Sequence, residues 1–371
     1  MNPAFLVLIE CAFCSFLITY LTIPSVINLA YQKNLFDVPD ERKVHTQLIP
    51  SLGGIGIFIG VLISFTLFCS IATLVTYKYM LTAYLILFFM GIKDDLLPMP
   101  ASKKLLIQIL VASLIAYGGI RISTLHGLFG IEELPIAISY GLTIFFIVGV
   151  TNAYNLIDGV DGLAGGLGGI GCITLGFLLL YVQEYDYAIL AFAIAGSLLA
   201  FLRFNFGTYP NKIFMGDGGS LLLGLTITIL SIQFIESPKT LSALNINSPL
   251  GIILGIIFIP IYDTIRVFTI RILNGNSPFQ PDKKHIHHEF LKSKVGHLQT
   301  SIFLWIGNVM MISAVLLFRN QNTINLILIV LTVGSLFVHA LVIIRQRREA
   351  KKIDQLSHEL NQIKKENYLI Q

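Results

Sequence analysis

The chain has 371 residues, of which 55% are hydrophobic and only 12% are charged. Soluble globular proteins carry about 25% charged residues, so this composition excludes a protein that hides its apolar surface in one aqueous core. Lipid must solvate most of that surface, which leaves the class of polytopic membrane proteins. The net charge of +4 says little by itself, and we expect no nucleic-acid partner.

Apolar stretches separated by short polar breaks run along the chain, and each predicts a helix. The stretches are 4–31, 51–76, 79–92, 104–120, 134–151, 163–182, 187–202, 217–236, 249–270, 300–318 and 323–344. Two of them, 79–92 and 187–202, are short for a full span. The sequence therefore predicts an all-α polytopic membrane domain over residues 1–344, with about eleven transmembrane helices.

The distribution of lysine and arginine predicts the orientation in the membrane. If the loops alternate across the bilayer, the side of loop 32–50 holds all 25 of these residues except Lys78, Arg121, Lys239 and Arg319. The positive-inside rule makes that side cytoplasmic. An odd number of helices then places the N-terminus outside and the C-terminus in the cytoplasm.

Residues 345–371 differ in kind from the rest of the chain, because they are charged and carry only a loose apolar period. This pattern predicts a cytoplasmic tail that forms a short amphipathic or coiled-coil helix. Its basic start suits anionic headgroups. We assign the tail no chemistry.

The glycines from Gly165 to Gly171 include a pair four residues apart, a spacing that lets neighbouring helices pack closely. We prefer this interpretation to a phosphate-binding loop.

Polar clusters occupy the predicted cytoplasmic loops. The first loop carries Arg42, Lys43 and His45, a cationic patch that suits phosphate but is also typical of any positive-inside loop.

The second cytoplasmic loop carries Asp94 and Asp95 just past an apolar helix, followed by Lys103 and Lys104. Adjacent carboxylates at a membrane face are costly unless they meet a cation. A divalent ion or the lysines would supply it.

The third cytoplasmic loop, 151–163, contains no lysine or arginine. It holds Asn152, Asn155, Asp158 and Asp161. Such hard oxygen donors without a local counter-charge indicate Mg²⁺ or polar contacts to a nucleotide.

The fourth loop brings Phe214 and Asp217 to the start of a long apolar helix. Asp217 suits either a plain N-cap or a metal ligand, and a helix N-terminus also favours bound phosphate. The Phe214 ring is suited to stacking on a base.

The fifth loop carries His285, His287 and His288 beside two lysines. This cluster indicates a transition-metal site or a pyrophosphate-binding patch. We favour the anion, because zinc usually takes supporting cysteines and the predicted cytoplasmic loops have none. Upstream, Asp263 and Arg266 are expected to pair, in a structural or a functional role.

A site rich in Asp and Asn for Mg²⁺, rich in cations for phosphate and placed beside lipid predicts phosphoryl transfer from a soluble nucleotide to a lipid phosphate. A transporter would place its charges near the bilayer midplane and often show inverted repeats. A scaffold protein would not explain five loops of carboxylates and histidines.

Four ordered motifs carry a family resemblance: Asp94-Asp95, N-A-Y-N-L-I-D-G-V-D-G-L from Asn152, F-M-G-D-G-G-S from Phe214, and H-I-H-H from His285. Together they resemble the polyprenyl-phosphate N-acetylhexosamine-1-phosphate transferases, over residues 37–288. The H-I-H-H form is similar to the bacterial undecaprenyl-phosphate GlcNAc-1-phosphate transferases that start O-antigen, teichoic acid or capsule synthesis. The H-H-H and T-P-T-M-G-G motifs of the phospho-MurNAc-pentapeptide transferase are absent. Gly218 stands where the family commonly has Thr.

The resemblance implies transfer of an N-acetylhexosamine 1-phosphate, by default GlcNAc-1-phosphate, from a UDP-sugar to undecaprenyl phosphate, with release of UMP. Another UDP-N-acetyl sugar is the alternative donor. The resemblance also implies Mg²⁺ (or Mn²⁺) and a multi-pass location in the bacterial cytoplasmic (inner) membrane with the active site facing the cytoplasm. A homodimer is a further expectation, which no motif carries.

The resemblance also assigns roles to residues. It implies Asn155 and Asp217 as Mg²⁺ ligands and Lys104 as a contact to the lipid phosphate or the pyrophosphate. It implies Phe214 and Asp161 as uracil contacts, and His285, His287 and His288 as contacts to the pyrophosphate and sugar phosphate. Asp94 and Asp95 resemble an essential pair of disputed role. We add Asn152, Asp158, Arg42, Lys43 and His45 as substrate-binding residues. For Asp94 or Asp95 we expect a role in orienting or deprotonating the acceptor, with a covalent phospho-aspartate as the rival route.

Overall fold

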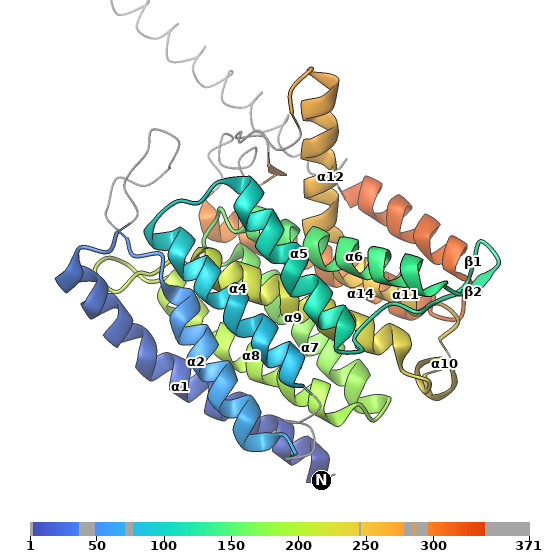
Figure 1. The fold of residues 1–371 in the computed structure, drawn as a ribbon, viewed down its shortest axis with the longest axis horizontal. Helices are drawn as coiled ribbons and strands as arrows, with labels where there is room; N and C mark the ends of the chain where they lie inside the picture. The colour runs from blue at the N-terminus through green and yellow to red at the C-terminus, as the bar shows by residue number, and fades with distance from the viewer. Residues whose placement is uncertain are drawn as a thin grey trace, which may run out of the picture.

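Long apolar stretches become helices because lipid offers no hydrogen-bond partner, so each backbone group must be satisfied within its own segment. The computed structural model describes residues 3–36, 49–70, 77–244, 246–277, 285–286 and 296–337. Figure 1 shows these segments as a bundle of helices with one small hairpin at its side.

In chain order the helices are α1 (Pro3–Lys33), α2 (Gly53–Phe68), α4 (Lys78–Leu96), α5 (Ala101–Tyr117), α6 (Ile136–Ile157), α7 (Leu163–Tyr181), α8 (Tyr185–Asn205), α9 (Gly216–Glu236), α10 (Thr240–Ala243), α11 (Pro249–Ile256), α12 (Phe258–Leu273) and α14 (His297–Leu317). A further apolar helix covers Thr323–Phe337. The strands are β1 (Thr124–Leu128) and β2 (Ile131–Glu133).

Within the described residues, six helices are long and apolar enough to cross a membrane. They are Phe5–Lys33 of α1, α6, α7, α8, α9 and α14. The pair α11 and α12 makes a seventh if it is counted as one span broken by a 74° bend. Each of the eleven predicted stretches contains a helix, and the predicted class of a helical, multi-pass membrane protein is confirmed. The number of spans and the orientation of the termini stay predictions.

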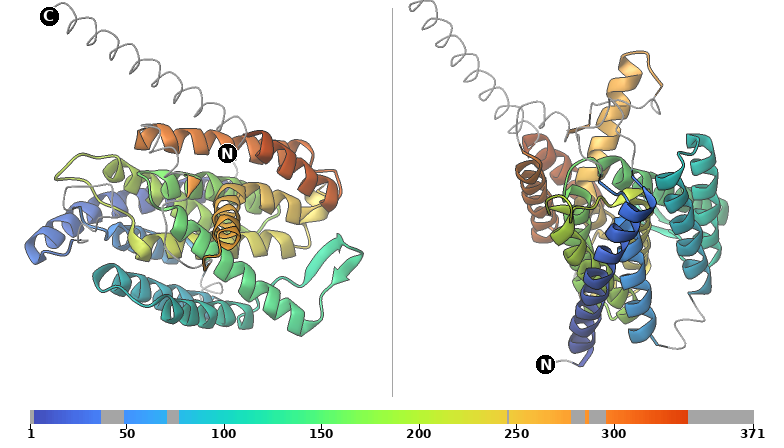
Figure 2. Two further views of the ribbon diagram at one scale, coloured as in Figure 1. Left: turned by 90° about the horizontal axis from the view of Figure 1, so that it is seen from above. Right: turned by 90° about the vertical axis from the view of Figure 1, so that its left-hand side faces the viewer.

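Helix α9 is the central element of the bundle. It has no separate polar face, as expected of a helix surrounded by protein. In its most apolar stretch of 18 residues, 94% of the residues are buried. Helices α2, α4, α6 and α7 pack against it. Figure 2 shows α4 and α5 on one side of the bundle and α14 on the other. The start of α9 is thus held by several helices at once.

The prediction of an all-α fold is wrong between α5 and α6. There β1 and β2 pair antiparallel, with Thr124 opposite Glu133 and Leu128 opposite Ile131. The two residues between the strands, Phe129 and Gly130, both have positive φ, which suits a tight hairpin turn. Strands of five and three residues are too short to register in a search for apolar stretches of spanning length.

The glycine cluster of α7 lets neighbouring helices approach, as the sequence predicts. A Cβ at Gly166 would lie 2.0 Å from the Trp305 ring of α14, and one at Gly168 would lie 2.5 Å from Leu223 of α9. Gly169, on the same helix, has nothing within 4 Å of such an atom.

We therefore expect Gly166→Ala to lower the free energy of unfolding by about 1–3 kcal/mol, because the added methyl group overpacks the Trp305 contact. Gly169→Ala is the matched control and should be neutral or slightly stabilising, since alanine favours helix. Thermal unfolding in detergent compares the two. Equal melting temperatures for both variants would contradict this packing.

Candidate active site

Four helix ends meet at one end of the bundle and bring together polar residues that are far apart in sequence. Helix α4 ends with Asp94 and Asp95, α5 begins near Lys104, α6 ends just after Asn155, and α9 begins with Asp217. Helices α4 and α6 both pack against α9, and α5 packs against α4 and α6. The second, third and fourth predicted polar clusters therefore converge.

The entry into α9 is a closely packed backbone turn. Before it, the chain pairs with the segment that leads into α2, because Phe214 N donates to Pro50 O at 2.9 Å and Gly53 N donates to Phe214 O at 2.9 Å. Gly216 then has φ +73°, a left-handed conformation suited to glycine. A Cβ there would lie 2.1 Å from Ser51 O. Only glycine fits this position.

Asp95 caps the start of α9 from a different helix. Its Oδ1 accepts from the backbone N of Asp217 at 2.7 Å, and its Oδ2 accepts from the backbone N of Gly218 at 3.0 Å. The carboxyl group satisfies two of the N–H groups that a helix start leaves unpaired. Asp95 thus fixes the position of Asp217.

Asp217 itself is not the N-cap of α9. That position belongs to Met215, so the plain N-cap alternative is wrong. The side chain of Asp217 instead faces other helices, because its Oδ2 lies 3.0 Å from the ammonium of Lys104 and its Oδ1 accepts from Asn155 Nδ2 at 2.9 Å. It lies where a ligand or a metal ion can be held between α5, α6 and α9.

Lys104 bridges two carboxylates. Its Nζ forms ion pairs with Asp94 Oδ2 and with Asp217 Oδ2. The other oxygen of Asp94 accepts from Met99 N at 2.6 Å, where the chain turns from α4 to α5. The cation that the adjacent carboxylates require is therefore supplied by a lysine, one of the two sources that the sequence predicts.

The third predicted loop is mostly helix, because α6 runs to Ile157, so the predicted helix end at residue 151 is wrong. Asn155 lies on its last turn, and its Nδ2 also donates to Ser220 Oγ at 2.9 Å. Asn152 exchanges two hydrogen bonds with Gln108 of α5, at 2.6 and 3.2 Å. The Asn152 side chain thus links α5 to α6, and its predicted substrate contact stays a prediction.

Asp158 follows α6 directly and is half-buried. Burial, together with the nearby carboxylates of Asp217, Asp95 and Asp161, raises the pKa of Asp158 well above its usual range. This corner of the site is short of positive charge and would accept a further cation.

A second polar cluster surrounds Asp161. Its Oδ2 lies 2.6 Å from Lys212 Nζ and 3.4 Å from His297 Nδ1. Its Oδ1 is buried and has no hydrogen-bond partner among the described residues. Lys212 Nζ lies 5.5 Å from the centre of the Phe214 ring, so both predicted uracil contacts adjoin one lysine. The cluster leaves an acceptor and an aromatic face near each other.

Lys212 and His297 are not among the site residues predicted from the sequence. Lys212 had a local signal, since it stands two residues before Phe214. His297 had none, because it begins α14, more than a hundred residues after Asp161.

His285 lies beside Asp263 of α12, and its Nδ1 is 2.9 Å from Asp263 Oδ2. The expected Asp263–Arg266 pair is present at 3.3 Å. Helix α12 packs against α6, which carries Asn155. The remaining predicted residues of the site, Arg42, Lys43, His45, His287 and His288, lie outside the described part of the chain, as does tail 345–371.

Asp217 and Asn155 suit an ion of the Mg²⁺ type. The described residues contain no group of three or more His, Cys, Asp or Glu side chains that could hold a metal by themselves. Mg²⁺ commonly takes one or two carboxylates and completes its octahedron with water and substrate phosphates. The Asp217 carboxylate is joined to the Asn155 amide, whose oxygen and nitrogen exchange by a simple flip. These two side chains would hold such an ion.

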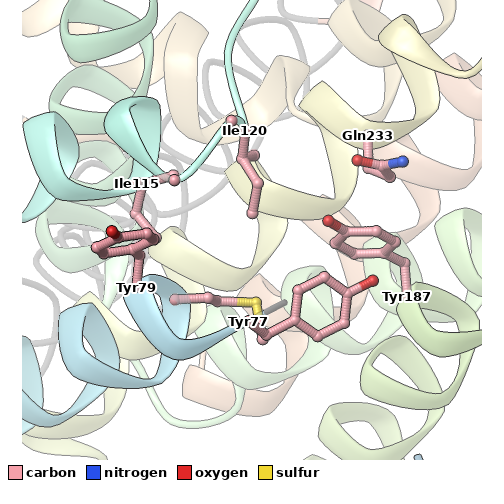
Figure 3. A pocket seen from close by; sticks show the side chains of 9 residues that line it. Tyr77, Tyr79, Ile115, Ile120, Tyr187 and Gln233 are labelled. Carbon is pink, nitrogen blue, oxygen red and sulfur yellow. The ribbon is translucent and has the colours of Figure 1, made fainter. Parts of the chain in front are cut away.

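A cavity of about 180 Å³ opens at the opposite ends of the same helices (Figure 3). Its lining is Tyr77, Tyr79, Met80, Ile115, Gly118, Gly119, Ile120, Tyr187 and Gln233. No ionised group lines it, so it has neither the cation nor the carboxylates that phosphate chemistry requires. The candidate active site is therefore the cluster at the start of α9.

The fold and the site define a multi-pass membrane protein with carboxylates, an amide and a lysine gathered at one end of its helices. A family model described as glycosyl transferase family 4 matches residues 77–235, from the start of α4 to the end of α9. The chain is 37% identical over 309 residues to a probable undecaprenyl-phosphate N-acetylglucosaminyl 1-phosphate transferase of Bacillus subtilis, covering 82% of this chain and 84% of the relative. It is 29% identical over 353 residues to the undecaprenyl-phosphate alpha-N-acetylglucosaminyl 1-phosphate transferase of Escherichia coli K12, covering 93% of each chain.

The chain therefore belongs to glycosyl transferase family 4.

Replacing Lys104 tests the bridge between the carboxylates. Lys104→Met leaves Asp94 and Asp217 facing each other without a cation, so we expect a lower melting temperature in the absence of divalent ions. Adding Mg²⁺ should raise the melting temperature of this variant more than that of the wild type, because the ion replaces the lost charge. Lys103→Met, at the exposed neighbouring position, is the control. An identical Mg²⁺ response in both variants would contradict the bridge.

Proposed function

We propose that this protein transfers an N-acetylhexosamine 1-phosphate, in the first place GlcNAc-1-phosphate, from its UDP-sugar to undecaprenyl phosphate. The products are undecaprenyl-diphosphate-sugar and UMP. One observation carries the proposal: Lys104 and Asn155 converge on Asp217 at the ends of membrane-embedded helices. The activities for which the Bacillus subtilis and Escherichia coli relatives are named support it.

The acceptor needs positioning more than it needs a strong base. The second pKa of a phosphate monoester is about 6, so undecaprenyl phosphate is largely ionised at neutral pH. Lys104 can pair with a phosphate oxygen in place of a carboxylate, and this holds the acceptor near the donor. Asp95 keeps the first turn of α9, and Asp217 with it, in place.

The reaction is a single displacement at the β-phosphorus of the donor. An oxygen of undecaprenyl phosphate forms a bond to that phosphorus while its bond to the bridging oxygen breaks, and UMP leaves with the electron pair. Mg²⁺ held by Asp217 and Asn155 would neutralise charge on the pyrophosphate. The Asp94 carboxylate forms an ion pair with Lys104 and accepts a hydrogen bond from Met99 N. Its geometry therefore favours a positioning role over that of a covalent nucleophile.

The donor is held at three places in this proposal. Uracil stacks on Phe214, and Asp161 contacts the uracil edge. His285, together with His287 and His288, binds the pyrophosphate and the sugar phosphate. Arg42, Lys43 and His45 add positive charge, and Asp158 adds a polar contact.

The membrane location and the orientation of the protein are part of the same proposal. The site faces the cytoplasm of a bacterial inner membrane, where UDP-sugars are available, with the N-terminus outside and the C-terminus inside. About eleven helices cross the bilayer. A homodimer is part of the proposal, and so is a separate tail at residues 345–371.

The two ends of α9 offer a matched test. We expect Asp217→Asn to reduce UMP release by at least about 100-fold, because the change removes a charge from the metal-binding carboxylate. Glu236→Gln alters a carboxylate at the other end of α9, where it accepts from Ser123 N and Thr124 N. That control should keep its turnover per folded molecule.

The assay uses purified protein in detergent with undecaprenyl phosphate, Mg²⁺ and a panel of UDP-sugars. Release of UMP only with UDP-GlcNAc, abolished by EDTA, is the expected result. Release with a different UDP-sugar would keep the reaction and change the donor. No release by folded wild-type protein with any donor would refute the proposal.

A further inference from the structure

A buried carboxylate on α12 holds the start of the H-I-H-H segment. Asp263 is 1% exposed and His285 is 5% exposed. Asp263 Oδ2 lies 2.9 Å from His285 Nδ1, and Asp263 Oδ1 accepts from the backbone N of Ile286 at 2.8 Å. One side chain therefore fixes both the ring of His285 and the backbone that follows it.

These contacts satisfy a group that would otherwise be costly to bury. A carboxylate away from water needs donors for its oxygens. Here a ring nitrogen and a backbone amide supply them, and the guanidinium of Arg266 lies 3.3 Å from Oδ1. Arg266 compensates the charge of Asp263, so the expected Asp263–Arg266 pair is one part of a larger cluster.

The contact with Asp263 determines which ring nitrogen of His285 carries a proton and which one is left for a ligand. An ionised carboxylate only accepts hydrogen bonds, so Nδ1 must carry a proton and Nε2 is the nitrogen that Asp263 does not hold. When both nitrogens are protonated, Nε2 donates to a phosphate oxygen while Asp263 balances the charge of the ring. The same carboxylate prevents the ring from flipping, since the flip would remove the partner of its oxygen.

We propose that Asp263 is a positioning residue for sugar-phosphate transfer: it fixes the orientation and tautomer of His285 so that Nε2 faces the phosphates of the donor. This inference rests on the proposed function. It gives a functional role to a pair that the sequence leaves undecided between structure and function. It also explains why a buried carboxylate stands within helix α12.

The sharpest variant is Asp263→Asn, which keeps the size of the side chain. Its amide oxygen can still accept from Ile286 N, so the segment stays attached. Its NH₂ group cannot accept from a protonated His285 Nδ1 and can only donate to an unprotonated one. The variant therefore reverses the tautomer of the ring and removes the negative charge that balances a doubly protonated His285. We expect kcat to fall by about 10- to 100-fold, as on removal of a residue that orients a functional histidine. The KM for undecaprenyl phosphate should change little, and so should the melting temperature.

A double-mutant cycle separates positioning from a general structural effect. The rates of UMP release are compared for wild type, Asp263→Asn, His285→Ala and the double variant. If Asp263 acts through His285, Asp263→Asn should change the rate by less than about threefold in the His285→Ala background. An equal loss in both backgrounds would overturn the inference, as would full activity of Asp263→Asn. If wild-type protein releases no UMP, the proposed function itself fails, and the inference fails with it.

Discussion

The capping of α9 by Asp95 is the contact on which the site depends. A helix start leaves backbone N–H groups without partners, and in α9 these groups lie inside the protein. The partner comes from α4, so the position of Asp217 is fixed by a second helix rather than by its own turn. The end of α4 and the start of α9 can therefore move only together.

The close approach of helices that permits this cap relies on glycine. A Cβ at Gly91 would lie 2.4 Å from the Cα of Gly218, and one at Gly54 would lie 2.3 Å from Gly219 N. Three helices thus touch backbone to backbone beside the carboxylates. Gly218 lies in this contact, which keeps α4 and α9 close. The rigid packing explains how a small polar cluster can be held at the end of a mostly apolar bundle.

Charge alternates through the site and joins its parts. Lys104 pairs with both Asp94 and Asp217, Lys212 lies between Asp161 and the Phe214 ring, and Arg266 lies beside Asp263. In each case a cation offsets a carboxylate that would be costly alone at low dielectric. Phosphates of a substrate can compete for the same cations, so an arrangement that stabilises the protein without ligand also suits an anionic ligand.

The sequence predicted the helical membrane fold because apolar stretches of spanning length have few alternatives. It drew attention to Asp94 and Asp95 because adjacent carboxylates at a membrane face are costly unless they meet a cation. The family resemblance, rather than this cost, implied Asn155 and Asp217 as metal ligands and Lys104 as a phosphate contact. The sequence did not predict the contacts between distant positions, such as His297 with Asp161 or Asp263 with His285, since these depend on how helices pack. The boundary of α6 was missed because asparagine is typical of loops, although here its side chains bond to neighbouring helices.

The central claim is that the β-phosphoryl group of a UDP-sugar moves to a lipid phosphate at this site. Donor labelled with ³²P at the β-phosphorus tests it most directly, with label followed in the lipid and nucleotide fractions. We expect label in the lipid-linked sugar, unlabelled UMP in equal amount, and no transfer without undecaprenyl phosphate. Label that stays in the nucleotide, or that appears as free phosphate without the lipid, would contradict it.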